Sequence, residues 1–223
     1  MASTAVFEKP QAKYVHGDDG APLGEEVPGI TRPMTYEEYI TSPEEMARYD
    51  IIDGYKVYYT WGQEKLANPT RLHQEIQGNI YEAFRAWQRA TKAGRTIQAP
   101  CDVRITYQPN RVRQPDILVI SNERLAANPP ITDPTPLSPA PELVVEIVSP
   151  SDTKAVLSAK LADYCTVDVR ECWVAASGAK TVEVLRLARD GTVTTVATYA
   201  EGDTAHSEVF PGLSVPVSAV FEE

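Results

Sequence analysis

The segment Leu143–Val148, LVVEIV, places one carboxylate, Glu146, among side chains typical of a buried strand. Desolvating a carboxylate is costly unless the group is paired or bound to a metal. A second acid, Asp116, immediately precedes the apolar run Ile117–Ile120. If the two segments pair, both carboxylates can converge at one sheet edge and bind Mg²⁺ or Mn²⁺, with phosphate and water completing the coordination. The two acids therefore suggest metal-assisted phosphoryl chemistry.

A lysine would complete such a site, because its ammonium can stabilise charge that develops in the transition state or orient an attacking water. Lys160 is the candidate, since it lies in a predicted helix after the Glu146 segment that could fold back over the sheet. A purely structural interpretation stays open at this point. Asp116 could be a turn or cap residue, and Glu146 could form a salt bridge with Arg104 or Arg113.

The first half of the chain predicts a short helix, a hairpin and a long helix, in that order. The short helix begins after Thr35, a suitable N-cap, and the hairpin turns at Asp53-Gly54 between two β-rich runs. The long helix lies within residues 68–94, with Gly94 expected just past its C-terminus. Its apolar stripe consists of Leu72, Ile76, Ile80, Phe84 and Trp87.

The second half predicts strands around another helix. The β-like segments are CDVRITY, DILVI, ELVVEIV, ECWVAA, KTVEVLRLA and VTTVATYA, and the segment TKAVLSAKLADYCTVD predicts the helix. Between DILVI and ELVVEIV, the proline-rich stretch NPPITDPTPLSPAP predicts a surface loop. We therefore expect an α/β (α+β) fold with a mixed sheet flanked by helices. The domain would span 34–223, after an extended or flexible arm over 1–33.

The composition of the 223 residues narrows the class of protein. No apolar run is long enough to span a bilayer, and the N-terminus lacks a secretory-signal pattern, so we expect a cytoplasmic protein without a membrane partner. The spacing of Cys165 and Cys172, with no histidine nearby, favours buried thiols over a zinc site. The net charge of −10 disfavours non-specific binding of nucleic acid over a broad surface but allows a local basic patch.

The ordered motifs RQPDILVI, PELVVEIVSPS and KLADYCTVDVRECWV resemble the Uma-two family of endonuclease-like proteins. Segments on both sides of these motifs also match, so the resemblance covers roughly residues 34–222 in one unbroken order. It implies a restriction-endonuclease-like fold of the PD-(D/E)XK type and Mg²⁺-dependent hydrolysis of DNA phosphodiester bonds. By analogy with that fold it also implies a homodimer.

The resemblance assigns the two motif acids to Asp116 and Glu146. In the parent fold a lysine usually stands two residues after the glutamate, where this chain has Val148. The resemblance instead places the lysine in the following helix, at Lys160, with Lys154 as an alternative. The preceding residues AVLSA are neutral, whereas the family's helix often carries charges there.

Two further residues are predicted to support the site. His73, with Gln74, matches a His-Gln pair of the family and could orient a metal ligand or position water. The alternative is a surface histidine that caps its own helix, and Glu75 could compete for the role. Gln114, two residues before Asp116, is expected to point to the same side of its strand and to hold substrate or water.

Besides the endonuclease, two other functions stay open. The same fold could serve as a non-catalytic DNA- or protein-binding module, which the acidic charge and the absence of a strand lysine favour. A metal-dependent hydrolase of a small phosphorylated substrate would also suit an acidic protein. No nucleophile elbow, P-loop or dinucleotide fingerprint occurs in the chain.

Overall fold

The computed structural model describes residues 25–26, 33–42, 49–58, 70–130, 132–148 and 154–222. The arm predicted for 1–33 lies outside this part of the chain except for β1 (Glu25–Glu26) and Pro33. Both the arm and the single domain over 34–223 therefore stay predictions. In the ranges that are described, no helix is long and apolar enough to cross a membrane.

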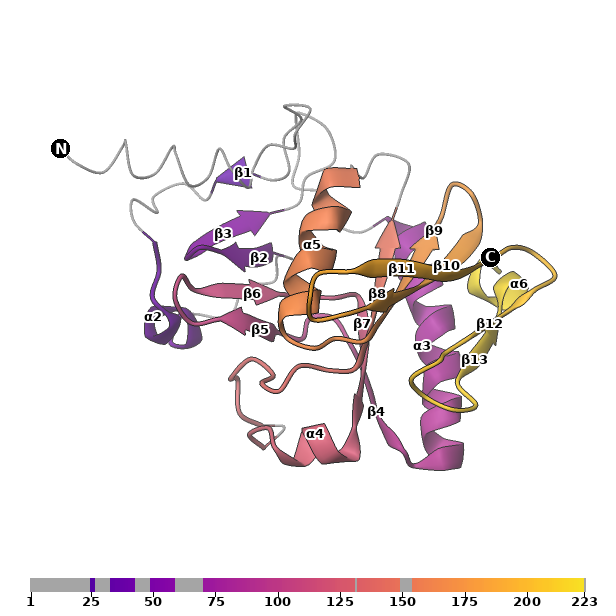
Figure 1. Ribbon diagram of the computed structural model, residues 1–223, viewed down its shortest axis with the longest axis horizontal. Coiled ribbons are helices and arrows are strands. Elements are labelled where there is room, and N and C mark those ends of the chain that lie inside the picture. The colour runs from indigo at the N-terminus through magenta and orange to yellow at the C-terminus, as the bar shows by residue number, and fades with distance from the viewer. Residues whose placement is uncertain are drawn as a thin grey trace.

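The described elements form two main sheets and a small third one (Figure 1). The helices are α2 (Tyr36–Ile40), α3 (Arg71–Thr91), α4 (Asn122–Ala126), α5 (Lys154–Thr166) and α6 (Val217–Val220). The strands of the larger sheet are β4 (Gly94–Gln98), β7 (Ile117–Ser121), β8 (Leu143–Val148), β9 (Glu171–Ala176), β10 (Thr181–Leu187) and β11 (Val193–Tyr199). The other strands are β1, β2 (Tyr49–Ile52), β3 (Tyr55–Tyr58), β5 (Val103–Thr106) and β6 (Arg111–Arg113) in the second sheet, and β12 (Thr204–His206) and β13 (Ser214–Pro216) in the third.

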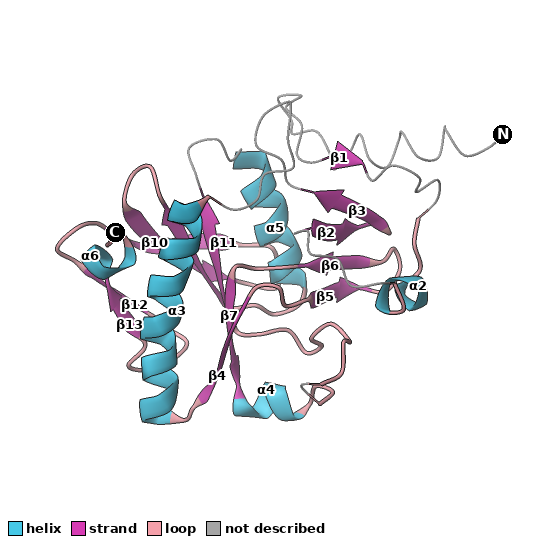
Figure 2. Cartoon of the chain, turned by 180° about the vertical axis from the view of Figure 1, so that it is seen from behind, coloured by secondary structure: helices cyan, strands magenta, loops and turns pink. Residues whose placement is uncertain are grey.

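The larger sheet has the strand order β11-β10-β9-β8-β7-β4. Strands β8 and β9 are parallel and are connected by α5, whereas the other neighbouring pairs are antiparallel. Helices α3 and α5 pack on different faces of this sheet, and the second sheet lies beside α5 (Figures 1 and 2). This arrangement confirms the predicted mixed sheet flanked by helices.

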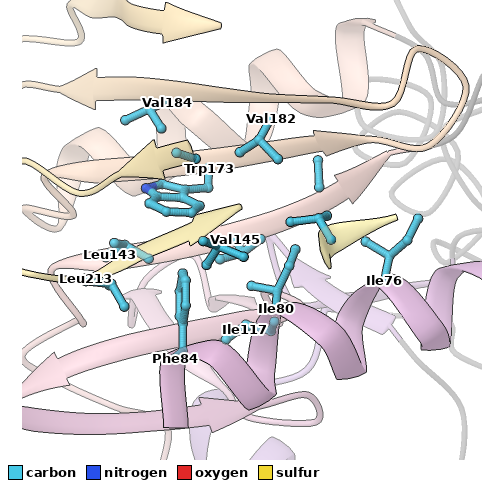
Figure 3. Packing of buried hydrophobic residues seen from close by; sticks show 14 of the residues in the cluster. Ile76, Ile80, Phe84, Ile117, Leu143, Val145, Trp173, Val182, Val184 and Leu213 are labelled. Carbon is cyan, nitrogen blue, oxygen red and sulfur yellow. The ribbon is translucent and has the colours of Figure 1, made fainter. Parts of the chain in front are cut away.

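The face of the sheet under α3 is the larger apolar core (Figure 3). The helix contributes the buried stripe Ile76, Ile80, Phe84 and Trp87. Phe84 meets Trp173 of β9 edge to face, with ring centroids 5.2 Å apart. Burying a side chain of this size contributes about 1.5–3 kcal/mol, so the stripe fixes α3 on the sheet. Leu72, also predicted for the stripe, is 41% exposed because it lies in the first turn.

Strand alternation decides which side chains of β8 face each helix. Leu143, Val145 and Ile147 belong to the core under α3, whereas Val144 packs with residues of α5. Glu146 is on the same side as Val144. The carboxylate in the middle of this apolar strand therefore points toward α5.

The turn chemistry of the N-terminal half is as predicted. Thr35 caps α2 in a reciprocal capping box with Glu38. Asp53 turns the hairpin with φ 51°, and Gly54 follows with φ 87°. A Cβ on Gly54 would lie 2.7 Å from the Cβ of Pro33, so only glycine fits the turn.

The end of α3 differs from the prediction. The left-handed residue that ends the helix is Lys92, with φ 54°, and Gly94 already begins β4. A Cβ on Gly94 would approach the carbonyl oxygen of Ile120 to 2.5 Å, so the glycine allows close packing of β4 on β7. The short elements β4, β6 and α4 were not predicted, because so few residues carry little periodicity.

Candidate active site

Asp116 lies where β7 begins and its antiparallel partner β8 continues past it. Its backbone N–H donates to the carbonyl of Val145 at 3.1 Å, and its Oδ2 accepts the N–H of Ile147 at 2.7 Å. The carboxylate thus caps a backbone donor of β8 beyond the ladder that joins β7 and β8. Asp116 is 1% exposed, and it fulfils the capping role that the sequence left open.

Helix α3 supplies two polar side chains to Asp116. The Nε2 of His73 lies 2.9 Å from Oδ1 of Asp116, and the amide of Gln77 donates to the carbonyl oxygen of Asp116 at 2.9 Å. His73 precedes the buried Ile76 by three residues, and Gln77 follows His73 by four, so both lie along the face that packs on the sheet. The apolar stripe therefore positions His73 at the edge of the sheet. Gln77 was not predicted, although its spacing from His73 could have indicated it.

Helix α5 supplies two hydrogen-bond donors to Glu146. The ammonium of Lys160 donates to Oε2 at 2.8 Å, and the hydroxyl of Tyr164 donates to Oε1 at 2.6 Å. Glu146 and Lys160 are 3% and 7% exposed, so the ion pair is buried. Lys160 and Tyr164 are four residues apart and share one helix face. The sequence predicted Lys160 and missed Tyr164.

Tyr164 remains a hydrogen-bond donor at physiological pH. Complete burial, together with the nearby carboxylates of Glu146 and Asp50, raises the pKa of its phenol well above the ordinary value of 10.0. A neutral phenol can donate to Glu146, whereas a phenolate would repel it. Tyr164 therefore holds one carboxylate oxygen of Glu146, Oε1, while Lys160 contacts the other, Oε2.

Arginines on β6 connect α5 to the second sheet. Arg113 contacts Asp50 of β2 at 2.7 Å and Asp163 of α5 at 2.6 Å, and it is 2% exposed. Arg111 contacts Asp163 at 2.8 Å. Because Asp163 directly precedes Tyr164, this ionic network fixes the part of α5 that reaches Glu146.

The other predicted residues lie elsewhere. Lys154, at the start of α5, is exposed, and so are Gln74 and Glu75 on α3. Gln114 lies between β6 and β7, where the chain is not a strand, so strand alternation does not orient it. Its amide donates to Oδ1 of Asp102 at 2.7 Å. The predicted role of Gln114 in holding substrate stays a prediction.

Two acids of the site, Asp116 and Glu146, are available to a divalent cation. No group of three histidine, cysteine, aspartate or glutamate residues that could hold a metal occurs in the described part of the chain. Mg²⁺, however, is commonly held by one or two carboxylates together with substrate phosphates and water. Asp116 and Glu146 supply that number of hard oxygen donors, from neighbouring strands. Cys165 and Cys172 are free buried thiols, as predicted.

Comparison with known proteins identifies the family. Residues 36–218 match the Uma2 family, described as "Putative restriction endonuclease". A crystal structure from Anabaena variabilis ATCC 29413, titled as a putative nuclease belonging to DUF820, matches with a TM-score of 0.64 and 17% identity, over 85% of this chain and 98% of that one. At this identity the match shows a shared fold. No curated protein matches the chain. The family match spans most of the chain, which therefore belongs to Uma2, the family that its motifs resemble.

Proposed function

We propose that the protein is a metal-dependent endonuclease that hydrolyses DNA phosphodiester bonds. The observation that carries this proposal is the buried contact between Lys160 and Glu146 at 2.8 Å. The contact brings the acid of an apolar strand together with a lysine of helix α5. In this chain Val148 stands where the parent fold usually has its lysine. The family description supports the same reaction class.

The two carboxylates that would hold Mg²⁺ or Mn²⁺ are Asp116 and Glu146. When bound there, the cation would supply Lewis-acid polarisation of the phosphate and a more acidic water. His73 orients Asp116 through Oδ1, and the N–H of Ile147 fixes its other oxygen. Such contacts keep a metal ligand in its binding geometry. Their loss commonly lowers metal affinity or activity by about 10–100-fold.

Lys160 would act on the substrate directly. Its ammonium carries three N–H donors on a flexible stem, so holding Glu146 is compatible with donating to a phosphate oxygen or to the attacking water. Charge builds on the phosphate oxygens as the ester bond breaks, and a nearby buried cation stabilises that charge. Tyr164 would keep Glu146 oriented while Lys160 acts.

DNA is the proposed substrate and a homodimer the proposed assembly, because cutting both strands of a duplex calls for two sites. The net charge of −10 means that DNA binding would depend on local basic surface. The same charge favours a second candidate function, hydrolysis of a small phosphorylated substrate by the same residues.

Plasmid nicking with Mg²⁺ or Mn²⁺ tests the proposal on three proteins: wild type, Glu146→Gln and Glu142→Gln. Glu142 directly precedes β8 and is also buried, so its variant makes the same chemical change four residues away from Glu146. We expect Glu146→Gln to lose about 10³-fold in rate, corresponding to about 4 kcal/mol, and Glu142→Gln to keep the wild-type rate per folded molecule.

Nicking retained in Glu146→Gln would overturn the proposal. Wild-type protein that binds Mg²⁺ in calorimetry and hydrolyses nucleotides, but leaves single- and double-stranded DNA intact, would establish the small-substrate hydrolase instead. Protein that neither cleaves nor binds metal would be a binding module of the same fold, with Glu146 in a structural role.

A further inference from the structure

A second candidate site is lined by neither of the two acids. A pocket of about 530 Å³ opens between α2, the start of β2, the turn at residues 99–102 and the proline-rich loop after α4. Its volume is within the range of about 300–1,000 Å³ typical of small-ligand sites. Asp116, Glu146, Lys160 and His73 do not line it, so the proposed cleavage chemistry does not account for it.

The walls of this pocket are stiffened by prolines and are apolar over most of their area. Four prolines, Pro100, Pro129, Pro130 and Pro134, contribute to the lining. Proline has a fixed φ and no N–H, so these positions restrict movement of the wall and offer no backbone donor to a ligand. Aliphatic side chains of β4, α4 and the loop complete the apolar surface. The walls therefore fit a flat or compact apolar body.

In the part of the chain that the structure describes, the charged groups that line the pocket are carboxylates. Asp102 and Asp133 line it, and no lysine, arginine or histidine does so among the described residues. The carboxylate of Asp102 accepts the amide of Gln114 at 2.7 Å and the hydroxyl of Tyr39, and both of these residues also line the pocket. The carboxylate of Asp133 accepts the N–H of Thr135 at 2.8 Å. The pocket thus presents oriented carboxyl groups against a mostly apolar wall, and burial raises the pKa of the Asp102 carboxyl.

We propose that this pocket binds a small organic cation, a protonated primary or secondary amine carried on an apolar ring system. The apolar body would lie against the prolines, and the ammonium would donate to Asp102. A carboxylate offers about four acceptor positions, and Gln114 and Tyr39 occupy two, so the residues that orient Asp102 leave room for a ligand donor. The charge of the lining selects a cation over an anion or a neutral ring.

Cys101 provides a readout that does not depend on DNA cleavage. It lines the pocket and is partly exposed, whereas Cys165 and Cys172, the other two cysteines, are buried. An occupied pocket would shield Cys101 from alkylation, and the two buried thiols serve as internal references. Burial and the adjacent Asp102 raise the pKa of the Cys101 thiol to about 12, so alkylation is slow and needs excess maleimide and a long incubation.

The test compares tryptamine with tryptophol, which has a hydroxyl in place of the ammonium, as protectants of Cys101 in the full chain. We expect tryptamine to protect with a Kd of about 1 mM or lower and tryptophol to protect at least about tenfold more weakly. Asp102→Asn should reduce protection by tryptamine to the level of tryptophol. Glu82→Gln, which changes the same net charge at an exposed site on α3, should leave it unchanged.

Asp133→Asn keeps the test decisive if Asp102→Asn does not fold, because Asp133 is exposed, and we expect about two- to threefold weaker protection by tryptamine. Equal protection by both compounds would overturn selection of a cation. Absence of protection by either compound would overturn the site. Unchanged protection in a folded Asp102→Asn protein would overturn the role of Asp102.

Discussion

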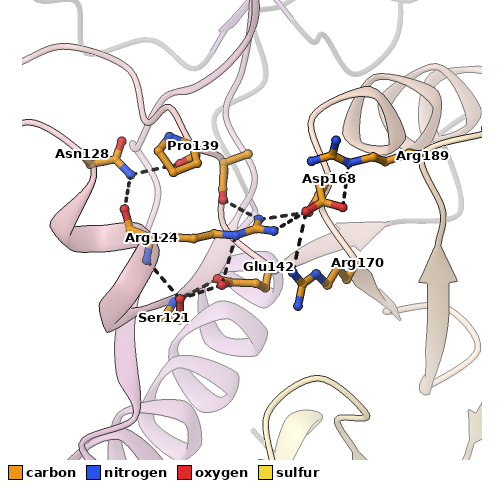
Figure 4. A network of polar contacts seen from close by, with 9 residues as sticks. Ser121, Arg124, Asn128, Pro139, Glu142, Asp168, Arg170 and Arg189 are labelled. Atoms are coloured by element: carbon orange, nitrogen blue, oxygen red, sulfur yellow. Dashed lines mark hydrogen bonds and ion pairs between the residues drawn. The ribbon is translucent and has the colours of Figure 1, made fainter.

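Two buried glutamates, one directly before β8 and one in its middle, are held in different ways. Glu142, directly before the strand, accepts the N–H of Ser121 at 2.9 Å and its hydroxyl at 2.6 Å, and it contacts Arg124 at 3.2 Å (Figure 4). Glu146, four residues later, accepts hydrogen bonds from the ammonium of Lys160 and the hydroxyl of Tyr164. One acid is thus tied to an arginine network and the other to a lysine and a phenol.

Arg124 shows what a structural arginine does. Its guanidinium contacts Glu142 and also the carboxylate of Asp168, and it donates to the backbone carbonyls of Ala140 and Asp168 at 2.8 and 3.0 Å. It therefore joins α4, the segment before β8 and the turn after α5 (Figure 4). A rigid fork with five donors suits such a junction, because it saturates several acceptors in one geometry.

Lys160 has the opposite properties. An ammonium is a single compact charge on a flexible stem, so it can keep one carboxylate while it approaches another anion. A buried acid alone therefore does not mark a reactive site. The kind of base that meets the acid separates a fixed junction from a place where a substrate phosphate could be bound.

Among variants of the bases that contact the two glutamates, removal of the lysine should have the largest effect. Lys160→Gln should lower the rate of DNA nicking by about 10²–10³-fold, as removal of a donor to developing charge typically does. It should also destabilise the fold, because Glu146 then lacks its described ion-pair partner in a buried position. Nicking rates per folded molecule and urea denaturation measure the two effects separately.

The double variant Lys160→Gln/Glu146→Gln sharpens this test. It removes the buried charge together with its partner, so we expect stability to recover toward the wild-type value while nicking stays absent. If Lys160→Gln cleaved at the wild-type rate, the contrast between the two glutamates would fail. Nicking that depends instead on Lys154 would be seen as a loss in Lys154→Gln.

The next effect is on stability alone. Arg124→Ala leaves Glu142 and Asp168 without their shared guanidinium, and we expect a loss of about 2–3 kcal/mol in the free energy of unfolding, because the Glu142 side is buried and the Asp168 side is partly solvated. Chemical denaturation measures this loss. The nicking rate per folded molecule should not change, and a tenfold decrease would show that the Arg124 end of β8 also serves the chemistry.

The sequence predicted those elements that carry a long or complete pattern. The stripe of α3, the hairpin with Asp53-Gly54 and the apolar β8 all follow from periodicity or turn chemistry. It missed β6, whose sequence Arg-Val-Arg is too short and too charged for a strand pattern. The charge of β6 makes sense only in three dimensions, where Arg113 lies between Asp50 of β2 and Asp163 of α5.

The candidate site was predicted in part for similar reasons. Resemblance indicated Asp116, Glu146 and Lys160, and the structure brings the last two into direct contact. Tyr164 lies within the motif KLADYCTVDVRECWV but was given no role at the site, although its spacing from Lys160 places it on the same helix face. Gln114 shows the limit of alternation, which orients side chains on a strand but not in the irregular segment between β6 and β7.

The smallest expected effect concerns pH dependence at Asp168, in the Arg124 network. Partial burial alone would raise the pKa of this carboxyl, but the hydrogen bond from Arg189 and the charges of Arg124 and Arg170 outweigh burial and lower the pKa below 3.8. A lowered pKa in the folded state stabilises the protein above the pKa of the unfolded chain. This stabilisation is lost as the pH falls through the folded value.

Asp168→Asn should therefore reduce the free energy of unfolding by about 0.5–1 kcal/mol near pH 7, and the difference from wild type should shrink toward zero as the pH falls through the lowered pKa of the folded state. Urea denaturation of both proteins across this range measures the difference. Salt at about 1 M should also reduce it, since Arg170 and Arg189 are 56% and 73% exposed and their charges are screened. A difference that stays constant or grows on acidification would show that Asp168 stabilises the junction through its hydrogen bonds rather than its charge. The arginine network around Glu142 and Asp168 would then not act through charge, unlike the Lys160–Glu146 pair.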